Sequence, residues 1–311
     1  MKLLSHIDLP GLKETLSHDA PGVELVIIPS QGPLPSDLDG EILLTYIAHP
    51  TNVDQVIAQC PSLRWIHAFG TGVDGFPLHL IGDRLLTVGR GATAVPIAEW
   101  IMAMMLAAVK HLPESWHQAA TGPWQSADLQ TLAGQTLAIA GFGTIGQALA
   151  QRAHAFGMTI RALTRTRHES GTAGVIFAAH WNDLVHDADH VVLALPLTNT
   201  TRNMVDSAAL AAMKPGAHLI NIARGPIVDQ DALRLALDSG HLALASLDTV
   251  TPEPLPQGHW LYDHPQIRLS PHISWSGPGM NKGMVQLFIG NLQRYLKQEA
   301  LEGRVDLASG Y

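Results

Sequence analysis

Residues 137–146 read Leu-Ala-Ile-Ala-Gly-Phe-Gly-Thr-Ile-Gly and indicate the fold class more clearly than any other segment. The apolar run predicts a strand over residues 137–140, and residues 147–156 continue as a helix. The turn between them has the pattern G-x-G-x-x-G, whose glycines permit a tight turn, close approach of a pyrophosphate and close packing of helix on strand. The helix N-terminus adds N–H groups and a positive dipole end. We therefore expect a dinucleotide phosphate site at Gly141, Gly143, Thr144, Ile145 and Gly146.

Strands and helices alternate on both sides of this turn. In the second half of the chain, candidate strands lie at residues 137–140, 159–163, 190–194, 218–222, 243–247 and 267–270. Six strands with helices between them make up a full dinucleotide-binding sheet. Earlier β-rich runs lie at residues 24–28, 41–48, 65–67 and 85–88, and longer helices are expected at about 96–112, as a buried helix, and at 281–298. The alternation predicts an α/β fold with parallel sheets.

Composition excludes several classes of protein. The chain has 311 residues, 46% of them hydrophobic and 15% charged, and a net charge of −8, which disfavours nucleic acid as a partner. No apolar run is long enough to span a bilayer, so no membrane association is expected. Cys60 is the only cysteine, which fits a reducing cytoplasm. The 17 histidines show no HExxH motif or dense ligand cluster, and no metal site is expected.

The residues after the second strand of this sheet predict which dinucleotide binds. An acid about 20 residues beyond the glycine turn would accept a hydrogen bond from the ribose 2′-hydroxyl of NAD. Here the strand is followed by Thr164, Arg165 and Thr166, with no acid before Glu169. Guanidinium and hydroxyl groups suit a 2′-phosphate, so we expect NADP(H) to be preferred, with NAD(H) as the second choice. The alternative is that the arginines are ordinary solvated surface residues.

Three downstream segments carry the residues for chemistry. They are Asn221-Ile-Ala-Arg-Gly225, Leu247-Asp-Thr-Val-Thr-Pro-Glu-Pro254 and Ser270-Pro-His-Ile-Ser274, each just after a candidate strand. Open parallel sheets bind ligands at this edge. Carbonyl reduction needs a cation for the carbonyl and carboxylate, an acid for the developing alkoxide and an anion that keeps this acid protonated. Arg224, Glu253 and His272 supply these three groups.

In these motifs and their order, the chain resembles the D-isomer-specific 2-hydroxyacid dehydrogenase family, in particular its glyoxylate/hydroxypyruvate reductase branch. The resemblance covers nearly the whole chain, beginning with Phe69-Gly-Thr-Gly-Val-Asp74. It implies that Arg224 binds the substrate, that His272 is the general acid, and that Glu253 hydrogen-bonds the imidazole. The N–H groups of Gly72 and Val73 would hold the substrate carboxylate. Further residues expected to bind the cofactor are Leu195, Pro196, Ile222, Ala223, Arg224, Asp248 and His272.

The resemblance also implies how the molecule is organised. It predicts two Rossmann-like domains: a discontinuous substrate domain, residues 1–93 and 274–311, and an inserted dinucleotide-binding domain, residues 94–273. A homodimer through the cofactor domain is expected, with residues 113–128, which include Trp116 and Trp124, as a candidate arm. Tyr46 and Trp275 are expected either to line the substrate pocket or to be plain core aromatics. The alternative to an enzyme is an NAD(P)H-binding sensor or co-regulator with little turnover.

Overall fold

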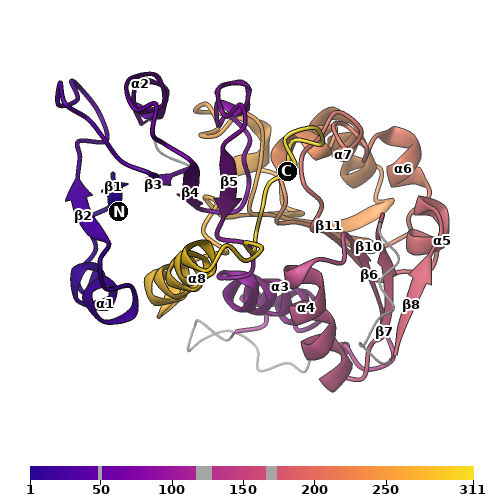
Figure 1. Cartoon of the computed structure of the whole chain (residues 1–311). Helices are drawn as coiled ribbons and strands as arrows, with labels where there is room; N and C mark the ends of the chain where they lie inside the picture. The colour runs from indigo at the N-terminus through magenta and orange to yellow at the C-terminus, as the bar shows by residue number, and fades with distance from the viewer. Residues whose placement is uncertain (48–50, 117–127, 166–173) are drawn as a thin grey trace. The chain divides into compact units, whose positions relative to one another are not determined.

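The computed structural model describes residues 1–47, 51–116, 128–165 and 174–311. The chain divides into two compact units, each with its own sheet (Figure 1). The first unit comprises Met1–Ala92 and Pro278–Tyr311, and the second comprises Thr93–Gly277. The assignment of the first unit to substrate and the second to cofactor stays a prediction.

The second unit is built on a seven-stranded sheet with the order β12-β11-β10-β9-β6-β7-β8. All its strand pairs are parallel. Counted from β6, this is the order of a dinucleotide-binding sheet, with one strand added beyond the sixth. The strands are β6 Thr136–Ala140, β7 Thr159–Leu163, β8 Val175–Ala178, β9 His190–Leu193, β10 Ala217–Asn221, β11 Leu242–Leu247 and β12 Ile267–Leu269.

Helices cover both faces of this sheet, because the side chains of its central strands are apolar on both sides. On one face, α3 Ala94–Val109 and α4 Thr144–Ala155 pack against each other and share a core with Leu137 and Ile139. On the other face, α5 Trp181–Val185, α6 Ser207–Ala211 and α7 Gln230–Asp238 enclose a second core. The two cores hold the strand ends in fixed positions.

Two features of this unit differ from the sequence prediction. The sheet has seven strands, because Val175–Ala178 forms an additional edge strand, β8, beside β7. It is half exposed at the sheet edge, so it does not form the buried apolar run that would mark it in the sequence. The helix expected to be buried, α3, buries Ile97, Ile101 and Met105 but leaves its opposite face accessible.

The first unit has a five-stranded parallel sheet with the order β2-β1-β3-β4-β5, a doubly wound arrangement. Its strands are β1 Lys2–Ser5, β2 Glu24–Ile27, β3 Ile42–Tyr46, β4 Trp65–Phe69 and β5 Leu85–Val88. Strand β1 was not expected from the sequence. Helix α2 Val53–Gln59 covers one face, and α1 Leu12–Asp19 with α8 Met280–Leu296 covers the other. Helix α8 comes from the far end of the chain, so this unit is discontinuous.

No helix within the described residues is both long enough and apolar enough to cross a membrane.

Candidate active site

The glycine turn lies where the order of the second sheet reverses, between β6 and β9. Gly141 has a φ of 98°, and a Cβ there would lie 2.4 Å from the carbonyl oxygen of Ala194, which follows β9. A Cβ on Gly146 would lie 2.6 Å from the carbonyl oxygen of Gly141, so helix α4 packs closely on the turn. A Cβ on Gly143 would meet nothing within 4 Å. The turn therefore leaves open space at the N-terminus of α4, as an approaching pyrophosphate requires.

The other residues expected to bind the cofactor lie along the same edge of this sheet. Thr164 and Arg165 follow β7 directly, and Arg165 is exposed. Thr166 lies outside the described residues. The partly buried pair Leu195 and Pro196 comes after β9, the buried pair Ile222 and Ala223 after β10, and Asp248 after β11. The carboxyl ends of five neighbouring strands thus carry residues of the predicted dinucleotide site.

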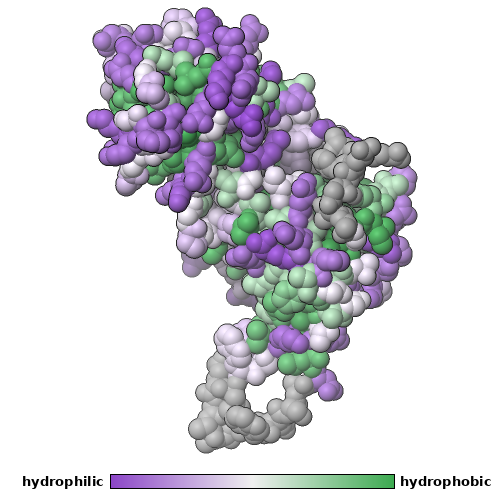
Figure 2. Space-filling view, turned by 60° about the horizontal axis from the view of Figure 1, so that its bottom comes forward, coloured by the Kyte–Doolittle hydropathy of each residue, from purple (hydrophilic) through white to green (hydrophobic). Residues whose placement is uncertain are grey.

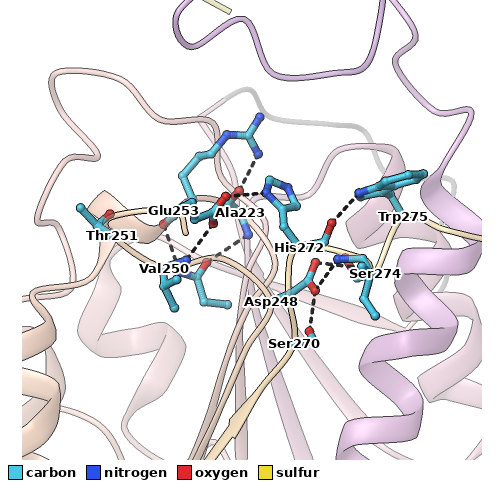
Figure 3. Close-up of polar contacts among 12 residues, drawn as sticks. Ala223, Asp248, Val250, Thr251, Glu253, Ser270, His272, Ser274 and Trp275 are labelled. Atoms are coloured by element: carbon cyan, nitrogen blue, oxygen red, sulfur yellow. Dashed lines mark hydrogen bonds and ion pairs between the residues drawn. The ribbon is translucent and has the colours of Figure 1, made fainter. Parts of the chain in front are cut away.

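His272 and Glu253 are joined by a direct hydrogen bond at this edge (Figure 3). The Nδ1 of His272 lies 2.9 Å from Oε2 of Glu253, and Oε1 of Glu253 accepts a hydrogen bond of 2.9 Å from the N–H of Val250. The two side chains are 38% and 37% exposed, so both are held in place and still reachable from solvent. The carboxylate holds the imidazole through Nδ1, which leaves Nε2 as the nitrogen that can face a substrate.

The environment of Glu253 keeps its carboxylate ionised. Partial burial by itself raises the pKa of a carboxyl group. The hydrogen bonds from His272 and from the N–H of Val250, together with the positive charges of His272 and Arg224, outweigh burial and lower the pKa of Glu253. A negative charge beside His272 is what an imidazolium proton donor requires.

Arg224 follows β10 on a backbone that Asn221 holds. The buried amide of Asn221 donates to the carbonyl oxygen of Arg224 (3.0 Å) and accepts from the N–H of Ala223 (3.0 Å). The guanidinium of Arg224 donates to the carbonyl oxygen of Ala223 at 2.6 Å. Asn221 was not expected as a site residue; its signal in the sequence is an amide side chain at the end of a strand, three residues before the arginine.

The loop that carries His272 is held by two neighbours. His272 itself has a φ of 53°, in the left-handed region that costs a residue with a Cβ roughly 1–2 kcal/mol. Trp275 Nε1 donates to the carbonyl oxygen of His272 at 2.6 Å, and its side chain is 39% exposed. Trp275 is therefore not a core aromatic. The carboxylate of Asp248 accepts hydrogen bonds from Ser270, Ile273 and Ser274 (Figure 3).

A cavity of about 680 Å³ opens beside the histidine and glutamate within the second unit. Asp248, Glu253, Ser270 and His272 supply its polar lining. Its apolar lining comes from the loop after β11, the short 3-10 helix Trp260–Tyr262 and β12, with Val250, Leu255, Leu261, Tyr262, Ile267 and Leu269. The carboxylate and the imidazole therefore border a space large enough for a small organic molecule.

Three predicted substrate-binding residues belong to the first unit. Tyr46 is the last residue of β3 and pairs in register with Phe69, the last residue of β4. The loop that follows β4 carries Gly72 and Val73, and the Val73 side chain is buried in the core. Tyr46 is only partly buried, so it is not a fully buried core aromatic. The structure brings these three residues to one edge of the first sheet, as it brings Arg224, Glu253 and His272 to one edge of the second.

The chain is similar to known proteins over most of its length. Residues 102–274 match the family model described as D-isomer specific 2-hydroxyacid dehydrogenase, NAD binding domain. A glyoxylate/hydroxypyruvate reductase B from Escherichia fergusonii is 33% identical over 263 residues, covering 81% of this chain and 79% of the relative.

Two solved structures are also similar over the full length. A D-isomer specific 2-hydroxyacid dehydrogenase from Xanthobacter autotrophicus Py2, in complex with NADPH and MES, is 26% identical with a TM-score of 0.86, covering 100% of this chain and 99% of that one. An NADPH-dependent glyoxylate/hydroxypyruvate reductase from Sinorhizobium meliloti, in complex with NADP and sulfate, is 25% identical with a TM-score of 0.84 over the same shares.

Proposed function

Because the chain belongs to the D-isomer-specific 2-hydroxyacid dehydrogenase family, we propose that it reduces a small 2-oxo acid of the glyoxylate or hydroxypyruvate type to the 2-hydroxy acid. The observation that carries this proposal is the His272–Glu253 hydrogen bond at the edge where the glycine turn and Arg224 also lie. This arrangement supports the assignment of His272 as proton donor, Glu253 as its anionic partner and Arg224 as the cation. The relatives reported above are named as reductases or dehydrogenases, which does not favour the alternative of a cofactor-binding sensor.

Each residue of the trio has a defined task in such a reaction. Arg224 binds the carboxylate of the 2-oxo acid and polarises its carbonyl. His272 gives the proton on Nε2 to the carbonyl oxygen as it becomes a hydroxyl group, and Glu253 stabilises the imidazolium beforehand. The bound nicotinamide supplies the hydride. In the first unit, the N–H groups of Gly72 and Val73 would hold the substrate carboxylate, and Tyr46 would line the site.

The experiment that tests this function is a steady-state panel of substrates. Glyoxylate, hydroxypyruvate and phenylglyoxylate would be compared with matching aldehydes that lack the carboxylate, each with NADPH. We expect turnover of at least one 2-oxo acid and poor turnover of the aldehydes, because only the acids can bind Arg224 through charge-assisted hydrogen bonds. Equal activity on an aldehyde and its matching 2-oxo acid would contradict the role of Arg224.

NADPH is the preferred cofactor in this proposal. Arg165 stands exposed directly after β7, where the adenosine ribose is expected, and two similar structures hold NADPH or NADP. A charge-assisted hydrogen bond to a 2′-phosphate contributes about 1.5–3 kcal/mol, or roughly a ten-fold preference or more. Titration of NADPH and NADH against the wild type and Arg165→Asp tests this. The mutant should prefer NADH, whereas a wild type that prefers NADH would make Arg165 an ordinary surface residue.

A homodimer through the second unit belongs to the same proposal, and helix α3 supports it. The face of α3 that points away from its own core carries Val95, which is 49% exposed, with Ala103 exposed and Trp100 and Met104 partly exposed. Figure 2, in which the bottom of Figure 1 comes forward, shows apolar surface interspersed with hydrophilic surface. Glu99, with a 65% exposed side chain paired with Arg152, lies between Val95 and Ala103 on the same face, so the apolar residues there flank one ion pair. Exposed apolar residues gathered around such a pair are typical of a subunit interface. Trp116 is exposed, and Trp124 lies outside the described residues.

Light scattering after size-exclusion chromatography tests the dimer. We expect twice the chain mass of 33.4 kDa for the wild type and the mass of one chain for Ala103→Glu, because a charge at the centre of an apolar interface is costly. Leu235→Glu on α7 is the matched control. Leu235 is 70% exposed in the same unit, and α7 packs on the opposite face of the sheet from α3. The mass of this variant should stay that of the dimer.

A cytoplasmic location is part of the proposal and is supported by the single, buried Cys60.

A further inference from the structure

Asp248 is a buried carboxylate at the end of β11, directly beneath the loop that carries His272 (Figure 3). Asp248 is only 1% exposed to solvent. Oδ1 accepts hydrogen bonds from the hydroxyl of Ser270 (2.5 Å) and from the N–H of Ile273 (2.9 Å), and Oδ2 accepts one from the N–H of Ser274 (3.0 Å). All three donors belong to the five-residue loop around His272.

The backbone of Asp248 holds the same loop. Its carbonyl oxygen accepts a hydrogen bond of 2.9 Å from the N–H of His272. One residue thus binds the loop at four places, on both sides of His272. His272 has a positive φ, which a residue with a side chain keeps only when its surroundings hold it there. The hydrogen bonds to Asp248 provide that restraint.

The donors around this side chain explain why a carboxylate is present. A carboxylate is acceptor-only on both oxygens, whereas an amide of the same shape has one acceptor and one donor. Asparagine at position 248 would therefore place an NH₂ group against the N–H of Ser274 or against Ser270 and Ile273. In a buried position neither water nor another side chain relieves such a clash, so the loop would shift.

We propose that Asp248 is a positioning residue, which holds the loop of His272 so that its Nε2 faces the substrate carbonyl. The role differs from the contact with the cofactor that the sequence suggested for Asp248. The proposal rests on the proposed function for the catalytic role of His272. The way in which Asp248 holds the loop does not depend on that function. A misplacement of a reacting group by about 1 Å can lower a rate roughly 10²-fold.

A double-mutant cycle tests whether Asp248 acts through His272. Asp248→Asn should lower kcat on the best 2-oxo acid by roughly 10²-fold and leave the Kd of NADPH within about three-fold of wild type. In His272→Asn the same change should lower kcat by less than about two-fold further, since the group being positioned is gone. A ten-fold rise in the Kd of NADPH with unchanged kcat would assign Asp248 to the cofactor and overturn the proposal. The proposal would also be overturned if the effects of Asp248→Asn and His272→Asn on the logarithm of kcat were fully additive.

Thr249→Val is the matched control. Thr249 is the next residue, equally buried, and its hydroxyl has no hydrogen-bond partner among the described residues. Its kcat should stay close to that of the wild type. If Asp248→Asn does not fold, Ser270→Ala replaces it in the cycle, because this change removes one hydrogen bond and no buried charge. Ser270→Ala should lower kcat by about three- to ten-fold, and unchanged kcat in that variant would overturn the proposal.

Amide hydrogen exchange separates this inference from the proposed function. The N–H groups of Ile273 and Ser274 should exchange at least about ten-fold faster in Asp248→Asn than in the wild type and Thr249→Val, whether or not the protein turns over a 2-oxo acid. A wild type without turnover would overturn the function alone. Unchanged exchange in Asp248→Asn would overturn the positioning role alone.

Discussion

At the scale of the residue, the hydrogen bond between His272 and Glu253 determines which nitrogen of the imidazole can work. Nδ1 is engaged by the carboxylate, so proton transfer to a substrate must use Nε2. Replacing His272 by asparagine should lower kcat for a 2-oxo acid by roughly 10²–10⁴-fold, because the proton donor is lost. Cofactor affinity, measured by quenching of tryptophan fluorescence, should be largely retained. Near-normal turnover in His272→Asn would remove the histidine from the mechanism.

Glu253 gives a second prediction at this scale, in the pH dependence. Its pKa is lowered by the hydrogen bonds from His272 and Val250, so it is ionised near neutrality and its charge does not limit activity there. As pH falls through this lowered pKa, Glu253 takes up a proton and the anion that holds Nδ1 of His272 is lost, so reduction should fade at low pH. Glu253→Gln removes the anion at every pH, so kcat should fall and should no longer depend on the titration of Glu253. A kcat–pH profile checks this, with Glu14→Gln at an exposed position of α1 as the matched control.

How far single residues could be predicted depends on the kind of signal they leave. Arg224, Glu253 and His272 stand out in the sequence, because each follows a strand and has a side chain suited to carbonyl reduction. Asn221 and Asp248 bind the backbone of those same loops. Hydrogen bonds to backbone N–H and C=O groups depend on the folded loop and leave no pattern of residue types, so only the structure reveals these roles.

At the scale of the element, the turn between β6 and α4 contains two glycines with different tasks. Gly146→Ala would force its Cβ to 2.6 Å from the carbonyl oxygen of Gly141, so we expect a lower melting temperature and weaker NADPH binding. Gly143→Ala meets no neighbour and should melt like the wild type. NADPH binding should still weaken, because the methyl group stands where the pyrophosphate approaches. Thermal melts and titrations of both variants test this, and equal loss of stability would contradict it.

The elements themselves were predicted to different degrees. Long or strongly apolar segments such as β6, β10 and α8 could be recognised, since their periodicity extends over several residues. The missed strands Lys2–Ser5 and Val175–Ala178 are as long as the recognised β5 and β9. Val175–Ala178 is half exposed at the sheet edge, so it does not form the buried apolar run that marks β9. Helix α3 was predicted as buried, but its exposed apolar face shows that a hydrophobic sequence does not reveal what covers it.

At the scale of the whole molecule, each unit encloses histidines that are neutral in the folded protein. Burial lowers the pKa of His67 to about 3 and that of His190 to about 4, and it lowers the pKa of His218 well below its usual value. His190 and His218 contact each other through Nδ1 (3.2 Å), between Gln135 and Ser246. Protonation of any of them requires a buried charge.

The sign of the pH dependence follows from these lowered pKa values. In the unfolded chain these histidines take up protons near pH 6.5, whereas in the folded protein His67 and His190 do so only near pH 3–4 and His218 well below its usual range. Stability should therefore be fully present above about pH 6.5 and fall progressively as pH drops towards 4. Urea unfolding at several pH values measures this. His190→Gln should reduce the pH dependence, and His186→Gln, at a 58% exposed side chain, should not.

The discontinuous first unit also has a consequence for the order in which the protein is made. Strands β1–β5 leave the ribosome first, but the helix that covers Leu3, Trp65 and Phe69 lies in Met280–Leu296. At about 5–20 residues per second, the whole of Thr93–Gly277 takes roughly 10–40 s to synthesise. During this time α1 can cover its share of the apolar face, but the part that α8 covers stays exposed. A chain stalled at Gly277 should therefore aggregate or be held by a chaperone. Residues 1–277, made alone, should become soluble when a peptide of residues 278–311 is supplied.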